Sequence, residues 1–180
     1  MAEQNTSNPH LTVLVAGQRY TLRDESGGAA RLFLKAIDGV FVVKVDGGVI
    51  AGAMGRRCDY LLENRAKEQT WLVELKGTDS DSACEQIKET VALLRTHPVL
   101  SQHKRDSIRG CVVSPRLQVP DIQSTWKRRA FRALYQASTK REALPEDHLL
   151  FIRCVSSVAG SSVSRSSTVR LNANTHPFDV

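Results

Sequence analysis

The sequence has few of the features that would staple or anchor a small protein. Its four cysteines, Cys58, Cys84, Cys111 and Cys154, include no CxxC pair and no Cys/His cluster at zinc-finger spacing. Each lies in a mostly apolar run, which favours buried free thiols over two disulfides. No apolar run approaches the roughly 20 residues that a membrane span needs, and the first ten residues do not resemble a secretory signal. We therefore expect a cytoplasmic protein that has no membrane partner.

Several common catalytic patterns are also absent. The five histidines are scattered, with neither HxH nor HExxH, so the sequence gives little support for zinc hydrolysis. Neither GxxxxGK[ST] nor GxGxxG occurs, which argues against a nucleotide-driven motor. The serines between 156 and 167 form no nucleophile elbow.

The length of 180 residues favours one domain with a substantial core. We expect a flexible leader over 1–10, a single domain over 11–155, and a Ser-rich, partly ordered C-terminal segment over 156–180. The apolar patterns predict the following elements: a hairpin of two short strands over 11–22, a helix over 26–39, strands within 40–48, 54–64 and 70–77, a helix over 80–97, a strand over 108–115, a helix over 121–141 and a strand over 148–156. This order predicts an α/β fold whose mixed sheet is flanked by helices.

The helix over 80–97 has the clearest signals. Ser82 precedes Glu85 by three residues, a capping-box pattern. An apolar stripe at Ala83, Ile87, Val91 and Leu94 follows the helical period.

Positive charge is concentrated in one part of the chain. The net charge is +6, and the segment 101–141 has ten lysines or arginines against two acidic residues. Such a block is typical of a protein that binds a polyanion, because neutralised phosphates release counterions. A solvated basic surface would explain the same pattern.

Two acidic residues and one lysine lie at the ends of the two strands within 54–64 and 70–77. Glu74 and Lys76 share one face of their strand, because side chains alternate. If the hairpin turns around Lys67, Asp59 lies opposite Leu75, and a shift of one residue places it opposite Glu74 or Lys76. Paired carboxylates are oxygen ligands of the kind that Mg²⁺ prefers, although a surface ion pair would also explain these charges.

Asp59, fourteen intervening residues, Glu74-Leu75-Lys76, and a following helix that contains Gln86 together resemble the PD-(D/E)XK nuclease superfamily. The resemblance implies a restriction-endonuclease-like core in the order αβββαβ. It also implies a catalytic set of Asp59, Glu74, Lys76 and Gln86, in which Asp59, Glu74 and the Leu75 carbonyl bind Mg²⁺, or Mn²⁺ in its place. Asp24 or Glu25 could supply one more acid. No proline precedes Asp59, which departs from the family pattern.

The same resemblance gives the basic residues a role. They are expected to contact the DNA backbone, with these candidates: Arg56, Arg57, Lys127, Arg128, Arg129 and Arg132. The expected function is that of a Mg²⁺-dependent DNA endonuclease, in restriction or phage defence or as a resolvase or repair enzyme. Many members dimerise to cut both strands, so a homodimer is one expected state. The alternative is a non-catalytic nucleic-acid-binding or assembly module with the same fold.

Overall fold

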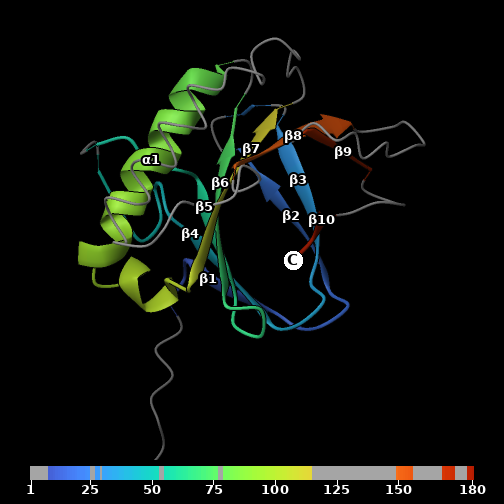
Figure 1. Ribbon diagram of the computed structural model, residues 1–180, viewed down its shortest axis with the longest axis horizontal. Helices are drawn as coiled ribbons and strands as arrows, with labels where there is room; N and C mark the ends of the chain where they lie inside the picture. The colour runs from blue at the N-terminus through green and yellow to red at the C-terminus, as the bar shows by residue number, and fades with distance from the viewer. Residues whose placement is uncertain are drawn as a thin grey trace, which may run out of the picture.

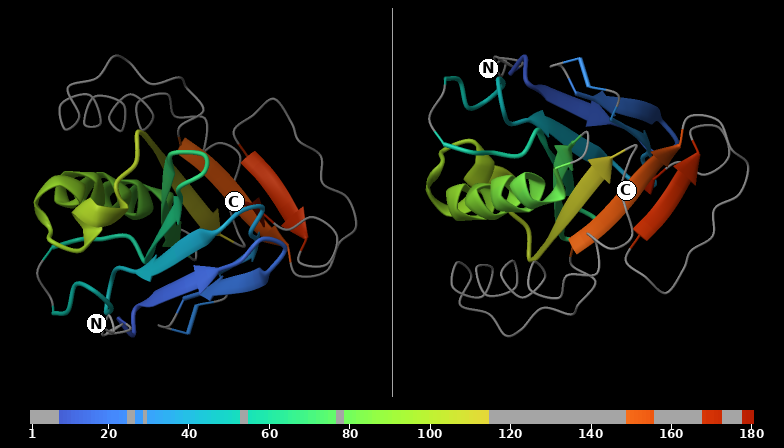
Figure 2. Two further views of the ribbon diagram at one scale, coloured as in Figure 1. Left: turned by 90° about the horizontal axis from the view of Figure 1, so that it is seen from below. Right: turned by 90° about the horizontal axis from the view of Figure 1, so that it is seen from above.

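The computed structural model describes residues 8–24, 27–28, 30–52, 55–76, 79–114, 149–155, 168–172 and 178–180. The described residues form an α/β fold that has a large mixed sheet, a small sheet and a long helix, α1 (Figure 1). The helix lies along one face of the large sheet, and the small sheet lies over the opposite face (Figure 2). The helix predicted over 121–141 lies outside the described residues.

The large sheet confirms the predicted mixed sheet. Its strands, in spatial order, are β1 (Leu11–Leu14), β4 (Val40–Lys44), β5 (Tyr60–Asn64), β6 (Gln69–Leu75), β7 (Ser107–Ser114), β8 (Leu149–Val155) and β9 (Thr168–Asn172). Pairing is antiparallel from β1 to β6 and parallel from β6 to β9. A parallel pair needs a crossover connection, and the segment that contains α1 supplies it between β6 and β7.

The small sheet corrects the prediction of a helix over 26–39. Its strands are β2 (Arg19–Arg23), β3 (Arg31–Lys35) and β10 (Phe178–Asp179), in the order β10-β3-β2. Along β3, buried Leu32 and Leu34 alternate with exposed Arg31 and Lys35. This is the period of a strand with one buried face, so it outweighs the helical reading of the same leucines. The order of elements before β4 is therefore three strands, rather than the predicted two strands and a helix.

The hairpin predicted over 11–22 is also wrong. Both strands exist, but β1 pairs with β4 in the large sheet and β2 pairs with β3 in the small sheet. The chain passes between the sheets through a turn in which Gln18 N–H donates to the Val15 carbonyl at 3.0 Å. Gly17 permits this turn because its φ is +82°, a value that few other residues adopt.

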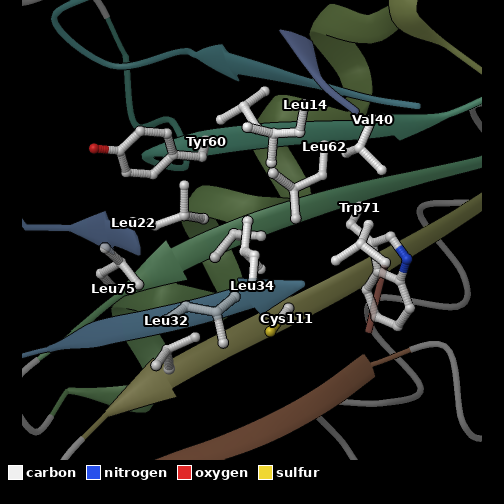
Figure 3. Packing of buried hydrophobic residues seen from close by; sticks show 14 of the residues in the cluster. Leu14, Leu22, Leu32, Leu34, Val40, Tyr60, Leu62, Trp71, Leu75 and Cys111 are labelled. Carbon is white, nitrogen blue, oxygen red and sulfur yellow. The ribbon is translucent and has the colours of Figure 1, made fainter. Parts of the chain in front are cut away.

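Two apolar cores hold the layers together, one on each face of the large sheet. Between the sheets, leucines of the small sheet meet Tyr60, Leu62, Leu75 and Trp71, with Tyr60 and Leu75 at one end of this core and Trp71 at the other (Figure 3). On the other face, α1 (Ser80–Thr96) and the short 3₁₀ helix η1 (Leu100–His103) cover the sheet. The predicted stripe of α1 is buried there, but its N-cap is Asp79, which accepts from Ser82 N–H, rather than Ser82.

Cys58, Cys84 and Cys111 are buried free thiols, in line with the prediction from their apolar surroundings. Among the described residues, no helix combines the length and the apolar character that crossing a membrane requires.

Candidate functional site

The β5–β6 hairpin brings Asp59, Glu74 and Lys76 together at one end of the large sheet. Tyr60 pairs with Val73, so the register is shifted by one residue from a turn centred on Lys67 and places Asp59 beside Glu74. Asp59 N–H donates to Glu74 Oε2 at 3.2 Å, and Leu75 N–H donates to Asp59 Oδ2 at 2.7 Å. Lys76 Nζ lies 3.2 Å from Glu74 Oε1. The Glu74 carboxylate is thus held by the amide of Asp59, and the Asp59 carboxylate is held by the amide of Leu75, the residue after Glu74.

The charged forms of the two carboxylates are destabilised by their surroundings. The side chain of Glu74 is only 1% exposed. Burial, followed by the nearby charge of Asp59, raises the pKa of Glu74 to about 8 despite the contact with Lys76. Burial likewise raises the pKa of Asp59 to about 6, against the lowering effect of the Leu75 amide. One lysine therefore does not compensate both acids, and a further cation would be favoured here.

These residues open onto a hollow of about 540 Å³ at the end of the sheet. Four carboxylates and three cations share it, and its full lining is Arg23, Asp24, Lys44, Asp46, Gly47, Asp59, Tyr60, Glu74, Leu75, Lys76 and Gln86. Arg23 and Asp24 come from the end of β2, in the small sheet, and Tyr60 ties the two layers together because its hydroxyl donates to the Arg23 carbonyl at 2.9 Å. The charge of Asp24 also acts to raise the pKa of Asp59. Of the two residues expected to supply one more acid, Asp24 is therefore at the site, whereas Glu25 lies outside the described residues.

The donor set fits a hard divalent cation. Asp59 and Glu74 offer carboxylate oxygens, and Leu75, the third predicted ligand, also lines the hollow. Within the described part of the chain, no three histidine, cysteine or acidic side chains are close enough to form a closed metal site. Mg²⁺ does not need one, because it keeps several waters and is usually bound by one or two carboxylates. These residues could therefore hold Mg²⁺ or Mn²⁺.

The predicted residues that precede Asp59 have different surroundings. Arg56 is exposed and stays a candidate for contact with a phosphate. Arg57 is only 4% exposed, its Nε is 3.0 Å from Asp46 Oδ1, and it also donates to the Gly52 carbonyl. The guanidinium of Arg57 thus holds the 46–52 turn beside the hollow, so of these two arginines Arg56 is the better candidate for a phosphate contact. Lys127, Arg128, Arg129 and Arg132 lie outside the described residues.

Gln86 contacts the backbone of the segment that leads to Asp59. It lines the hollow, and its Nε2 donates to the Arg57 carbonyl at 2.9 Å. It therefore holds the segment before Asp59, and none of its described hydrogen bonds joins it to Asp59 or Glu74.

Comparisons with known proteins give no relative. No family model matches the chain, and no curated protein or solved structure is significantly similar to it. The interpretation of the site therefore depends on its own geometry.

Three charged lining residues, Arg23, Lys44 and Asp46, were not predicted from the sequence. Arg23 could not have been found, because the false prediction of a hairpin over 11–22 gave no reason to place β2 beside the end of β5. Asp46 had a usable signal: the sequence Asp-Gly-Gly begins two residues after the last residue of β4, where a turn brings backbone and acid close to the sheet end.

The turn after β4 gives a test of how tightly the hollow is built. A Cβ added to Gly48 would lie 2.2 Å from the Lys44 carbonyl oxygen, which accepts from Val49 N–H. We expect Gly48→Ala to lower the free energy of unfolding by about 2 kcal/mol, because backbone would have to move. Gly39→Ala is the control, since its Cβ would be 4.0 Å from the nearest atom. Urea unfolding measures both, and equal midpoints for the two variants would contradict the close approach.

Proposed function

We propose that the protein is a divalent-metal-dependent nuclease of the PD-(D/E)XK type that acts on DNA. The observation that carries this proposal is the half-buried carboxylate of Asp59 next to the buried carboxylate of Glu74, both beside the ammonium of Lys76. The order of β4, β5, β6, α1 and β7 supports it, because the resemblance implies three antiparallel strands, a helix and a further strand. The first helix of that order has no counterpart among the described residues, where β1 to β3 precede β4.

In this proposal each residue has a defined task. Asp59, Glu74 and the Leu75 carbonyl hold the ion. A bound Mg²⁺ would lower the pKa of water, polarise the phosphate and offset charge in the transition state. Lys76, whose side chain is 28% exposed beside Glu74, would orient a water or contact a phosphate oxygen. The raised pKa values of the two acids favour this role, because strongly shifted groups gather at functional sites.

The choice of DNA depends on the basic segment 101–141. Two of its described members have partners within the fold: Arg105 pairs with Glu63, and the guanidinium of Arg109 lies 5.3 Å from the centre of the Trp71 ring. DNA binding is therefore assigned to Arg56 and to the four predicted residues between 127 and 132. A restriction or phage-defence endonuclease is the first choice of biological role, and a resolvase or repair nuclease is the second. A homodimer would allow both strands to be cut.

The test is whether ion binding and DNA cleavage depend together on Asp59. We expect calorimetry with Mn²⁺ to show heat of binding for the wild type, and a DNA duplex to be cut only when the ion is present. Asp59→Asn should lose both, because it removes a charged oxygen ligand. Glu85→Gln is the matched control, since Glu85 forms a partly exposed pair with Lys88 on α1, outside the hollow.

Two outcomes would overturn the proposal. Equal cleavage by wild type and Asp59→Asn would show that the cleavage does not come from the site at Asp59. Salt-sensitive DNA binding without any heat from the ion, in either protein, would instead favour the non-catalytic binding module.

A further inference from the structure

Helix α1 holds the three residues before Asp59 through three polar side chains on one stripe. Arg56 N–H donates to Glu89 Oε2 at 2.9 Å, Gln86 Nε2 donates to the Arg57 carbonyl at 2.9 Å, and Cys58 N–H donates to Thr90 Oγ1 at 2.8 Å. Residues three and four apart on a helix share a face, so these partners can follow an extended chain alongside. The helix therefore takes the place that a neighbouring strand would have.

This arrangement accounts for the way the hairpin opens at the site. Pairing between β5 and β6 begins at Tyr60 and Val73, and the chain before Asp59 is held by α1 instead. Asp59 is then fixed from both sides, because its carbonyl accepts from Val45 N–H at 2.8 Å and its N–H donates to Glu74. The position of the Asp59 carboxylate is set by the backbone on which it is carried.

Thr90 is the central member of the stripe. It is completely buried, it accepts from Cys58 N–H, and it donates to the Gln86 carbonyl at 2.8 Å. Glu89 and Arg56, by contrast, are exposed, so their bond competes with water. If Thr90 no longer accepts from it, the Cys58 N–H is left buried without a hydrogen bond. Because this is costly, the backbone at Cys58 would shift to find another acceptor.

We propose that Thr90 is a positioning residue for the ion site: by holding Cys58 N–H it keeps the Asp59 carboxylate against Leu75 N–H and beside Glu74. This inference rests on the proposed function, because it assigns Asp59 and Glu74 as the ligands. Replacing a residue that orients a metal ligand without touching the metal typically changes metal affinity by about ten- to a hundredfold.

The chain provides a matched control at the opposite end of the same hairpin. Thr70 is equally buried, its hydroxyl donates to the His103 carbonyl at 2.7 Å, and it accepts from Arg105 N–H at 2.9 Å. Thr70→Val and Thr90→Val thus remove one donated and one accepted bond each. Only the second change is next to the ion site.

The experiment compares wild type, Thr90→Val, Thr90→Ser and Thr70→Val in the full chain. Mn²⁺ affinity is measured by calorimetry, and exchange of the Asp59 and Leu75 amides is measured by NMR without the ion. We expect Thr90→Val to weaken Mn²⁺ binding by about tenfold and to speed exchange of both amides, whereas Thr90→Ser stays within about twofold of the wild type. Thr70→Val should lose stability but keep the wild-type affinity.

The two readouts separate failure of this inference from failure of the proposed function. Unchanged affinity and amide exchange in Thr90→Val, together with loss of binding in Asp59→Asn, would overturn the role of Thr90 and leave the nuclease proposal standing. If neither the wild type nor any variant binds Mn²⁺ but Thr90→Val still speeds exchange of the Asp59 and Leu75 amides, then Thr90 positions Asp59 and the proposed ion site is wrong. Equal effects of Thr70→Val and Thr90→Val on both readouts would reduce Thr90 to a general contribution to stability.

Discussion

Replacing Glu74 with glutamine should abolish ion-dependent DNA cleavage and, in the same protein, make the ion-free fold harder to unfold. The loss of activity should exceed about a hundredfold, because replacing a residue that only orients a ligand already costs about ten- to a hundredfold. Stability should rise because a neutral amide no longer carries a buried charge next to Asp59. Such a trade-off, in which a change raises stability and lowers activity, is expected where function needs a buried charge that destabilises the fold.

The sign of the pH dependence follows from the raised pKa values. Glu74 has a pKa of about 8 in the fold against 4.5 ordinarily, so the folded protein binds more protons than the unfolded chain between these values. Wild-type stability from this group is present below pH 4.5 and is lost as the pH rises toward 8, and Asp59 acts in the same direction up to about pH 6. Glu74→Gln should therefore exceed the wild type in free energy of unfolding by roughly 4 kcal/mol at pH 8 and by less at pH 5.

Urea unfolding at pH 5 and pH 8, with and without Mn²⁺, measures both effects. The ion should stabilise the wild type and leave Glu74→Gln unchanged, since only a folded protein with the site gains from binding. Glu85→Gln should follow the wild type throughout. A Glu74→Gln variant that is less stable than the wild type at both pH values would mean that Lys76 fully compensates Glu74.

The sequence was sufficient to predict the half of the fold in which local patterns agree with the tertiary structure. The strands around Val42, Leu62 and Val73 are predicted by short apolar runs bounded by turn residues, and the helix that contains Ile87 is predicted by its apolar stripe. The segment around Leu34 was assigned wrongly because three apolar residues fit a short helix as well as a strand, and pairing with β2 decides between them. Such pairing depends on residues far away, which local patterns do not include.

The site shows the same division. Pairing of the two strands brings the backbone of Asp59 beside Glu74-Leu75-Lys76 in each register considered, so this closeness could be predicted from the hairpin. The register that places Asp59 beside Glu74 is set by the structure. The support of Cys58 by Thr90 could not, because it depends on how α1 is rotated against the sheet. Nor did the sequence indicate that Glu63, on the same hairpin, is as buried as Glu74.

Glu63, at the opposite end of the hairpin, should be as important for stability as Glu74 is for activity. Its side chain is 0% exposed and accepts from Arg65 Nε at 2.7 Å, contacts His103 Nδ1 at 2.6 Å, and pairs with Arg105. Burial acts to raise the pKa of Glu63, but the hydrogen bonds from these three partners outweigh it and lower the pKa. Unlike Glu74, this carboxylate is well compensated.

We expect Glu63→Ala to lower the free energy of unfolding by about 3–5 kcal/mol, because removing one partner of a buried ion pair leaves the other charges without compensation. Glu85→Ala, which breaks a partly exposed pair, should cost less than about 1 kcal/mol. The depressed pKa gives the opposite pH dependence to that of Glu74: the stability from Glu63 is present above its ordinary pKa of 4.5 and is lost as the pH falls below it. Urea unfolding at pH 7 and pH 4 should therefore show the gap between Glu63→Ala and wild type narrowing in acid. A gap that stays the same at both pH values would show that Glu63 stabilises the fold by its volume and not by its charge.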